Sequence, residues 1–444
     1  MDLTGKRVVV VGLGSSGIAA ARLCARRGAR VLGTDSAGLS ELSKEVSELG
    51  VELAVGGHPA SFVGFDLVVV SPGVGPLPAL EAAGQAGVEV IGELELAWRH
   101  LSAPVIAVGG TNGKSTVTTV VARLLEGDRM TVFAGGNLGR PASEAAGGSW
   151  DAVVLEVSSF QLERAPTFKP KVAVLLNITE DHLDRYSDFA QYARAKGNAF
   201  ANQTTSDTAV IWTGDPECAR QARRGKGRLL RFHTQRQDAD FYVEGREVME
   251  ASTGLRFSLE RVPLHGLHNL LNAAAAIAAA RAFGVSAEGI QAGFLGFEPL
   301  PHRTELVGSI AGVTFYDDSK ATNVGASVNA LRGLQEPRAV LIAGGRDKLG
   351  GYEPLVEALR EKGRALVVIG EAASKIASAV GSAVPVEQAA TLVEAVASAY
   401  RLALPGDAVL LSPACSSFDM FKSYADRGEQ FARAVRSLQG ETTP

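Results

Sequence analysis

The sequence predicts an α/β protein made of three domains, and three observations support this. The chain has 444 residues, about three times the size of a typical domain. Short runs rich in valine and leucine alternate with helical patterns, as where Arg7–Val11 is followed by Gly17–Arg27. Strands that are apolar throughout are typical of a parallel sheet with helices on both faces. The prolines of Pro299–Pro301 predict a hinge before the last such stretch. We therefore expect domains over residues 1–97, 98–298 and 299–444.

The composition excludes several classes of protein. Lys and Arg number 44 against 48 Asp and Glu, a net charge of -4, so no broad basic face for nucleic acid or anionic lipid is predicted. No apolar stretch is long enough to cross a membrane. Three cysteines (Cys24, Cys218 and Cys415) lie far apart, which argues against a disulfide framework and a zinc site. We expect a monomeric cytoplasmic protein with small-molecule partners.

The first predicted domain carries a glycine-rich turn between a strand and a helix. The turn is Gly12–Gly17, with Gly14, Ser15 and Ser16 at its centre, and Asp35 ends the second strand. This pattern suits a dinucleotide, another nucleotide diphosphate, or close strand–helix packing without a ligand. A mononucleotide diphosphate fits the short domain best, because a two-halved dinucleotide fold would be cramped. The residues Ser71, Pro72 and Gly73 end the third strand and should border the same crevice.

Between residues 6 and 100, the pattern gives the following elements. Strands are expected at Arg7–Val11, Arg30–Thr34, Asp66–Val70 and Val88–Ile91, and helices at Gly17–Arg27, Ser40–Leu49 and Leu77–Ala86.

The second predicted domain begins with a phosphate-binding loop. The buried run Pro104–Val108 leads into Gly109–Thr116, and the helical run Val117–Leu125 follows. Glycine N–H groups and the helix N-terminus can hold phosphate, Lys114 adds a positive charge, and the Ser115 hydroxyl can reach Mg²⁺. Val108 stands where the common motif has its first glycine, so the pattern is the shorter G-x-x-G-K-[ST]. The loop residues are Gly110, Thr111, Asn112, Gly113, Lys114, Ser115 and Thr116.

Polar residues end the next two predicted strands, Ala152–Val157 and Lys171–Leu176. Ligands of open α/β sheets bind at the carboxyl ends of strands, so Glu156 is placed to share a magnesium ion with Ser115. A lone histidine such as His182 is more often a hydrogen-bonded structural residue than a ligand or catalytic group. From its surroundings alone, Lys196 reads as a surface lysine of a helix.

Further along, residues 205–262 suggest a small mixed β subregion, and an alanine-rich helix runs from His268 to about Phe283. In the third domain, Asp317–Asn323 and Ser412–Asp419 place polar groups after two strands. Cys415 reads as a packed thiol because no histidine is near it in the sequence. Strands are expected at Val313–Asp317, Arg338–Ala343, Leu366–Ile369 and Ala408–Leu411, and helices near Asn323–Leu331, Glu353–Lys362, Ala372–Val380 and Leu392–Leu402.

Together these motifs resemble the Mur ligases of peptidoglycan synthesis over nearly the whole chain. The residues that carry the resemblance are Gly110–Thr116, Glu156–Leu162, Asn177–Tyr186, His268-Asn269 with Asn272, Pro301–Arg303, Asp318–Asn323 and Ser412–Asp419. The N-terminal turn, Ser71–Gly73 and Ser158–Leu162 are most similar to the branch that adds D-glutamate. The resemblance implies an N-terminal Rossmann-like UDP-binding domain, a central P-loop ATPase-like domain and a C-terminal Rossmann-like domain.

The same resemblance implies a reaction and a set of ligands. ATP, UDP-N-acetylmuramoyl-L-alanine and D-glutamate would be the substrates, an acyl phosphate the intermediate, and no redox cofactor is expected. Two Mg²⁺ sites are implied, held by Ser115, Glu156, His182 and a carbamylated Lys196, which replaces the surface reading of that lysine. Lys114, His182 and Lys196 would be catalytic.

The remaining family positions are predicted ligand contacts. The nucleotide would contact the loop residues Gly110 to Thr116 with His268, Asn269, Asn272, Arg303, Asp318 and Lys320. The substrates would contact Gly14, Ser15, Ser16, Asp35, Ser36, Ser71, Pro72, Gly73, Asn137, Ser159, His182, Thr322, Lys348, Ser417 and Tyr424. Tyr424 stands where the family is expected to have phenylalanine, and Ser36-Ala37 lack a basic residue that some relatives use on UDP.

Three other functions stay open at this stage. A sister ligase, such as the L-alanine-adding enzyme or folylpolyglutamate synthetase, would share most of the motifs. A nucleotide-dependent oxidoreductase would use Gly12–Gly17 and Asp35, and a non-catalytic nucleotide switch would use the phosphate loop. The amino acid that triggers phosphate release separates them.

Overall fold

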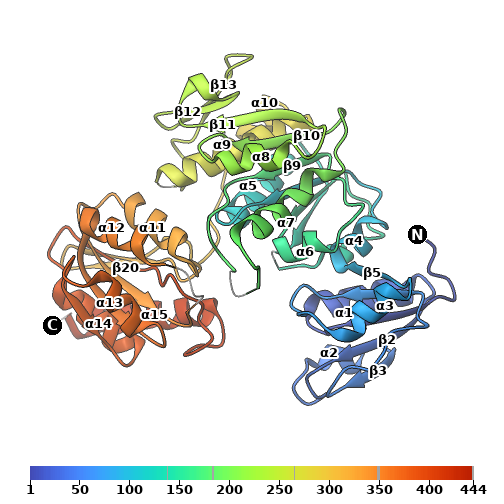
Figure 1. Cartoon of the computed structure of the whole chain (residues 1–444). Coiled ribbons are helices and arrows are strands. Elements are labelled where there is room, and N and C mark those ends of the chain that lie inside the picture. The colour runs from blue at the N-terminus through green and yellow to red at the C-terminus, as the bar shows by residue number, and fades with distance from the viewer. Residues whose placement is uncertain (138, 183–184, 265, 348–350, 443–444) are drawn as a thin grey trace. The chain divides into compact units, whose positions relative to one another are not determined.

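The protein contains three β-sheets with flanking helices (Figure 1). The computed structural model describes the chain except residues 138, 183–184, 265, 348–350 and 443–444. It divides into two compact units. The first unit comprises residues 1–178, 190–260 and 272–296, and the second comprises residues 179–189, 261–271 and 297–444.

The first sheet is fully parallel and has the strand order β3-β2-β1-β4-β5. Its strands are β1 (Arg7–Val11), β2 (Arg30–Asp35), β3 (Glu52–Val55), β4 (Leu67–Val70) and β5 (Glu89–Gly92). Its helices are α1 (Ser15–Arg26), α2 (Lys44–Ser47), α3 (Pro78–Gln85) and α4 (Glu93–Trp98). Alternate residues of β1 pack on opposite faces: Val8 and Val10 in the core with α1, Val9 and Val11 in the core with α3. Strand order reverses between β1 and β4, which is where ligands of such sheets bind.

One predicted helix is wrong in this domain. The expected helix Ser40–Leu49 is only the single turn α2, because Ser43 has extended backbone angles (φ -63°, ψ 151°) and the helix can begin only after it. Gly50, with φ of 66°, then redirects the chain into β3, a strand that the sequence pattern did not reveal.

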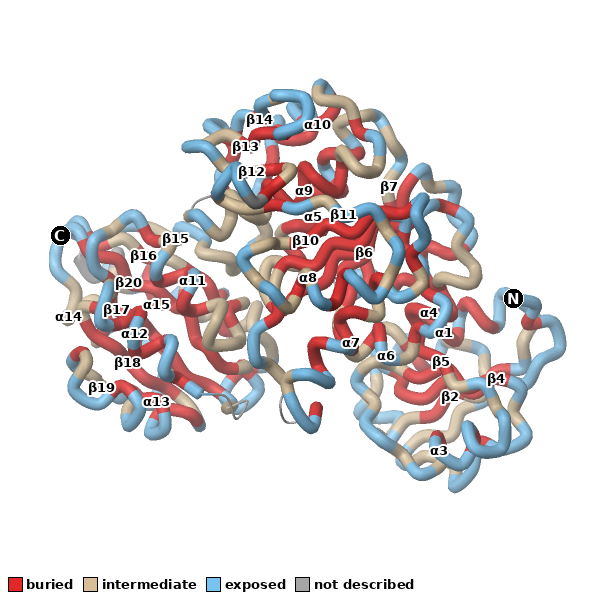
Figure 2. Tube along the Cα trace, turned by 45° about the horizontal axis from the view of Figure 1, so that its top comes forward, coloured by how far each residue is buried: buried red, intermediate tan, exposed pale blue. Residues whose placement is uncertain are grey.

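The central sheet has the order β14-β13-β12-β11-β10-β9-β6-β8-β7. Its strands are β6 (Val105–Gly109), β7 (Val132–Gly136), β8 (Ala152–Glu156), β9 (Val172–Leu175), β10 (Thr208–Trp212), β11 (Arg228–His233), β12 (Phe241–Glu244), β13 (Glu247–Glu250) and β14 (Arg256–Ser258). The strands from β7 to β12 pair in parallel, and β13 and β14 extend the sheet antiparallel. The expected mixed β subregion is therefore a continuation of the main sheet. Figure 2 shows β6 as part of a buried centre.

The helices of the central sheet pack closely where glycines meet. They are α5 (Lys114–Gly127), α6 (Ser159–Glu163), α7 (Phe189–Ala201), α8 (Pro216–Ala222), α9 (Leu267–Phe283) and α10 (Ala287–Phe294), with the 3-10 turns η1 (Ala142–Glu144) and η2 (Arg236–Asp238). A Cβ on Gly127 would lie 2.3 Å from the Gly289 carbonyl oxygen, so α5 and α10 approach at backbone distance. Residues Ala273–Ala280 of α9 are buried, as expected for the alanine-rich helix.

The third sheet has the order β15-β16-β20-β17-β18-β19, with only β15 antiparallel to its neighbour. Its strands are β15 (Glu305–Ile310), β16 (Val313–Asp317), β17 (Ala339–Gly344), β18 (Gly363–Ile369), β19 (Val386–Gln388) and β20 (Ala408–Leu411). Its helices are α11 (Val324–Gly333), α12 (Glu353–Lys362), α13 (Ala373–Val380), α14 (Leu392–Leu402) and α15 (Tyr424–Thr442). The core with α11, α12 and α13 covers one face, and the core with α14 and α15 covers the other. The α/β class predicted from the sequence is confirmed.

Candidate active site

The N-terminal glycine-rich turn follows β1, which pairs with β4 in the sheet. Gly12 has φ of 86°, and a Cβ on Gly17 would lie 1.8 Å from the Gly12 carbonyl oxygen, so α1 starts directly against the turn. The Ser71 hydroxyl donates to that carbonyl (2.7 Å) and joins the ends of the two strands. Asp35 accepts the N–H groups of Leu13 (2.6 Å) and Ala37 (2.9 Å). The carboxylate predicted to meet a ligand thus also holds two loops in place.

The other predicted contacts of this domain fall at the ends of its helices and strands. Ser15 and Ser16 begin α1 after Gly14, Ser36 follows β2, and Pro72 and Gly73 follow Ser71 beyond β4. Ser159 lies elsewhere in the same unit, where it is buried at the start of α6. The Ser158 hydroxyl and the Gln161 side chain form a capping box there, so part of the Ser158–Leu162 motif serves to stabilise the start of α6.

The phosphate loop is clamped by Asn177, which follows β9. The Thr111 N–H donates to the Asn177 carbonyl (2.9 Å), and the Asn112 N–H donates to Asn177 Oδ1 (2.8 Å). The Asn177 amide in turn donates to the Asn112 carbonyl (3.1 Å). Two left-handed glycines, Gly110 (φ 145°) and Gly113 (φ 86°), allow this path. Asn177 was noted only as part of a motif, since nothing in the sequence shows that β9 lies beside β6.

The positively charged side chain of the phosphate loop belongs to the first residue of a helix. Lys114 begins α5, and its Nζ donates to the Thr111 carbonyl (2.8 Å), so the side chain folds back over the loop. A Cβ on Gly113 would lie 2.5 Å from Asn272 Oδ1, which places that α9 side chain against the loop. A lysine charge and a helix N-terminus in one place form an anion site.

Oxygen donors for a hard cation lie on the next strand. Glu156 ends β8, next to β6 in the sheet, and is 3% exposed; Ser115 is 4% exposed. Asn137 donates its amide N–H to Glu156 Oε1 (2.8 Å), so two predicted site residues are in contact. The buried Glu156 carboxylate and the buried Ser115 hydroxyl at the start of α5 are oxygen donors of the kind that Mg²⁺ prefers.

Lys196 is buried rather than on the surface. The side chain is 3% exposed, donates to the Gly110 carbonyl (2.8 Å) and has its Nζ 4.6 Å from the centre of the Tyr192 ring. The Tyr192 hydroxyl lies 3.0 Å from Thr111 Oγ1. The first reading of Lys196 as a surface residue is wrong because α7 packs that face onto the phosphate loop. Tyr192 was missed, since one tyrosine in a helix gives no signal of its own.

His182 belongs to the second compact unit together with Asp181. It has φ of 57°, its N–H donates to Asp181 Oδ1 (3.0 Å), and its Nε2 lies 3.7 Å from Asp181 Oδ2. The Asn323 amide also approaches Asp181 (3.4 Å). This histidine therefore has a carboxylate partner close by.

A second set of predicted residues gathers after β16 and β20. Asp318 accepts from the Ser412 hydroxyl (2.7 Å) and the Thr304 N–H (3.1 Å). Burial raises the pKa of Asp318 to about 7, while the Ser412 hydrogen bond and the charge of Arg303 act in the opposite direction. Lys320 Nζ lies 3.8 Å from the centre of the Tyr424 ring. Asp318, Arg303, Lys320 and Tyr424 are thus neighbours within one unit.

The other predicted positions in this unit are less closely tied to the cluster. Burial lowers the pKa of His268 to about 4, so its ring is neutral at physiological pH. Ser417 is buried and Thr322 half-buried, Asn269 lies in the first turn of α9, and Lys348 falls outside the described residues. Cys415 is buried as predicted, and burial raises the pKa of its thiol to about 11.

Three family models match the chain in order. Residues 6–92 match the model described as Mur ligase MurD-like, N-terminal domain; residues 108–280 match the Mur ligase middle domain; residues 302–415 match the Mur ligase, glutamate ligase domain. The chain therefore belongs to the Mur ligase family, as its motifs indicated. The three-domain α/β organisation is confirmed with it.

Within this family, the chain is similar to enzymes named UDP-N-acetylmuramoylalanine–D-glutamate ligase. The protein of that name from Desulfosudis oleivorans is 46% identical over 99% of this chain and 98% of its own length. The one from Geobacter metallireducens is 44% identical over 99% of both chains. The solved UDP-N-acetylmuramate–alanine ligase of Thermotoga maritima matches with a TM-score of 0.63 at 20% identity, over 98% of this chain and 100% of its own, which shows a shared fold.

Among the helices that the structure describes, none combines the length and apolar character needed to cross a lipid bilayer.

Proposed function

We propose that this chain joins D-glutamate to UDP-N-acetylmuramoyl-L-alanine at the expense of ATP, in peptidoglycan precursor synthesis. The observation that carries the proposal is full-length similarity, 46% identity over 99% of the chain, to an enzyme named for this reaction. The phosphate loop with Lys114 and the buried Glu156 provides the chemistry that such a ligase needs.

The reaction has two steps, and its difficulty is the meeting of anions. An oxygen of the alanyl carboxylate attacks the γ-phosphorus of ATP, the bond to the ADP oxygen breaks, and an acyl phosphate forms. The amine of D-glutamate then attacks the carbonyl carbon, phosphate leaves, and the nitrogen loses a proton to give the amide. Transfer of a phosphoryl group depends on position and charge neutralisation more than on covalent help from the protein.

The residues of the first unit serve the phosphates. Lys114, held at the N-terminus of α5, neutralises charge on the transferring phosphoryl group, and the Asn177 clamp keeps the loop N–H groups oriented. Ser115 and Glu156 would hold Mg²⁺, which supplies further positive charge to the phosphate oxygens when bound. Lys196 becomes a metal ligand only if it is carbamylated, since an ammonium repels a cation. We propose this modification of Lys196, and we propose His182 as a further metal ligand.

The remaining assignments belong to the substrates. We assign the Gly14–Ser16 turn, Asp35, Ser36 and Ser71–Gly73 to the UDP portion, Asn137, Ser159 and His182 to the muramoyl-alanine portion, and Thr322, Lys348, Ser417 and Tyr424 to D-glutamate. We assign Asn272, His268, Asn269, Arg303, Asp318 and Lys320 to the nucleotide. We also propose domains at 1–97, 98–298 and 299–444, and a monomeric cytoplasmic enzyme.

Phosphate release across a panel of amino acids tests this function. Purified protein with ATP, Mg²⁺ and UDP-N-acetylmuramoyl-L-alanine should release phosphate with D-glutamate and far less with L-glutamate, glycine or L-alanine. Mass spectrometry should find the product heavier than the starting nucleotide by one glutamyl residue. Preference for another amino acid would identify a sister ligase. Phosphate release without an amide product would identify a nucleotide switch, and reduction of NAD⁺ would identify an oxidoreductase. Each of these results overturns the proposal.

A further inference from the structure

Arg303 lies between two residues with an unusual backbone. His302 has φ of 60° and Thr304 has φ of 48°, and neither is a glycine. Side chains with a Cβ rarely adopt this left-handed conformation, so the surroundings must hold it. The segment from 302 to 304 therefore depends on its neighbours for the conformation that presents Arg303.

Backbone hydrogen bonds supply part of that support. The His302 N–H donates to Glu305 Oε2 (2.8 Å), and the His302 carbonyl accepts from the Lys320 N–H (3.2 Å). The Thr304 N–H donates to Asp318 Oδ1 (3.1 Å). These bonds join the segment before β15 to the loop after β16.

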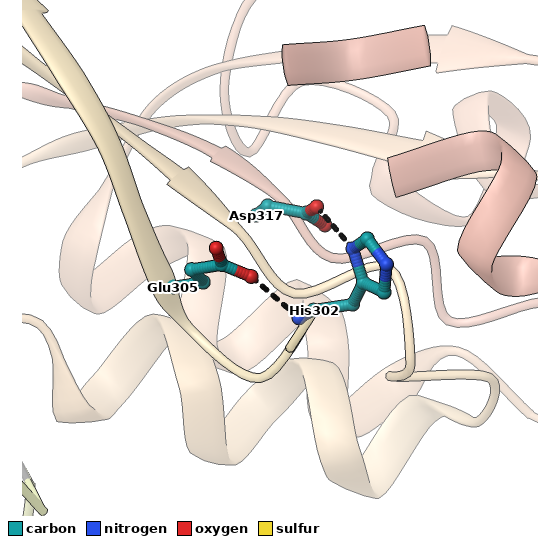
Figure 3. Close-up of side chains that lie close together, drawn as sticks. All are labelled: His302, Glu305 and Asp317. Atoms are coloured by element: carbon teal, nitrogen blue, oxygen red, sulfur yellow. Dashed lines mark hydrogen bonds and ion pairs between the residues drawn. The ribbon is translucent and has the colours of Figure 1, made fainter. Parts of the chain in front are cut away.

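The side chains of His302 and Asp317 add a direct link (Figure 3). His302 Nδ1 lies 2.7 Å from Asp317 Oδ2, and the other oxygen of Asp317 accepts the Ser319 N–H (2.9 Å). The Asp317 side chain is 2% exposed and that of His302 15%. One buried carboxylate thus fixes both the histidine and the loop that carries Lys320.

Helix α15 covers the pair at close range. A Cβ on Gly428 would lie 2.2 Å from His302 Nδ1 and 2.5 Å from Asp317 Oδ2, so only glycine fits at this position of the helix. The His302 ring meets the Tyr424 ring edge to face, with centroids 6.2 Å apart. The Ser319 hydroxyl donates to the Tyr424 carbonyl (2.8 Å). The pair therefore also sets the position of Tyr424, over which Lys320 lies.

A metal site is the obvious other reading of His302, Glu305 and Asp317, which offer ligand atoms within 4.8 Å of one another. The contacts favour hydrogen bonding instead. Nδ1 and Oδ2 are already bonded to each other, and Glu305 accepts a backbone N–H.

We infer that His302 and Asp317 form a positioning pair that holds Arg303, Lys320 and Tyr424 in their working arrangement. Neither member of the pair needs to touch the reacting atoms, and neither was assigned a role from the sequence. The inference rests on the proposed ligase function for what these three residues contact. It predicts that breaking the pair impairs use of ATP and D-glutamate and leaves the UDP substrate unaffected, since all residues predicted to bind the UDP portion lie in the first compact unit.

The test compares four variants with wild type in the full-length enzyme. His302→Ala removes the histidine, Asp317→Leu removes the acceptor at similar volume, and Asp317→Asn keeps an acceptor oxygen. Arg364→Ala is the matched control, because Arg364 pairs with the buried Asp407 (2.7 and 3.0 Å) in the same unit, apart from this network. The readouts are kcat, the KM for each substrate, the Kd of a fluorescent ADP analogue and the melting temperature.

We expect His302→Ala and Asp317→Leu to raise the KM for ATP and the Kd of the ADP analogue roughly tenfold and to lower kcat, because small displacements at a site cost one to two orders of magnitude. The KM for the UDP substrate should stay within about twofold, and Asp317→Asn should recover most of the loss. Arg364→Ala should lower the melting temperature only. The inference is overturned if His302→Ala binds and uses nucleotide like wild type, if Asp317→Asn is as impaired as Asp317→Leu, or if the control shows the same shifts. A wild-type enzyme that rejects D-glutamate would contradict the proposed function. The Kd of the ADP analogue would still test whether His302 and Asp317 act as a positioning pair.

Discussion

The phosphate loop and the cluster after β16 are stabilised in different ways. The phosphate loop takes its path from two left-handed glycines within one short motif, and the side chains of Asn177 and Lys196 bond to its backbone. The cluster after β16 is held by side chains that are far apart in sequence, such as the Ser412–Asp318 contact and the His302–Asp317 pair. A local motif keeps its shape through conformation, whereas an assembled cluster keeps it through pairwise contacts. Loss of the loop cation should therefore act on chemistry, whereas loss of a residue that makes pairwise contacts should act on position in either region.

The largest effect is expected at the cation of the phosphate loop. Lys114→Ala should lower kcat on the order of a thousandfold, because charge on the transferring phosphoryl group is no longer neutralised. The melting temperature should change little, since the bond from Lys114 Nζ to the Thr111 carbonyl lies within the loop itself. Lys169→Ala, at an exposed lysine of the same unit, is the control and should be as active as wild type. Steady-state kinetics decide the matter, and a Lys114→Ala variant with normal kcat would contradict the assignment.

A smaller loss of activity is expected when Asn177 is removed and Lys114 is kept. Asn177→Ala deletes the side-chain bonds to the Asn112 N–H and carbonyl, leaving loop groups less well ordered. The KM for ATP should rise roughly 10- to 100-fold, and stability should fall by about 1–3 kcal/mol. Asn198→Ala, which removes another asparagine that bonds to backbone in this unit, should lower stability without changing the KM. If the two variants have the same KM, the clamp does not shape the loop.

The smallest expected effect is on the pH dependence of stability, through Asp318 in the cluster after β16. Because burial raises the pKa of Asp318 from 3.8 to about 7, the folded protein binds this proton more tightly than the unfolded chain does. The contribution of Asp318 to stability is therefore full below pH 4 and is lost as the pH rises towards 7. Asp318→Asn cannot ionise, so its melting temperature should fall less than that of wild type between pH 5 and 8. Equal falls, measured calorimetrically without nucleotide, would show that Asp318 is already ionised.

The same contrast explains what the sequence could predict. The turn at Gly12–Gly17 and the phosphate loop depend on spacing within a few residues, so their positions at strand ends could be foreseen. The contact between Asn137 and Glu156 was not foreseen, although both residues were selected, because it depends on β7 lying beside β8. His302–Asp317 and the closeness of Gly428 join three elements that only the fold brings together.

Two predictions made from local sequence patterns were wrong. Lys196 looks like a surface lysine in its own helix and becomes a buried partner of Gly110 only through packing of α7 on the loop. The helix expected at Ser40–Leu49 shrank to one turn because Ser43 is extended. The resemblance to the Mur ligases corrected the first of these expectations, since it carries long-range information that local patterns lack.

The central claim is that γ-phosphate passes from ATP to the alanyl carboxylate before the amide forms. Its most direct test uses UDP-N-acetylmuramoyl-L-alanine with ¹⁸O in both oxygens of that carboxylate, together with ATP and D-glutamate. If an acyl phosphate forms, one labelled oxygen must leave with each phosphate released, because the carbonyl carbon loses that oxygen when the amine attacks. We predict phosphate that carries one ¹⁸O per amide formed, measured by mass spectrometry. Unlabelled phosphate alongside amide product would contradict the claim.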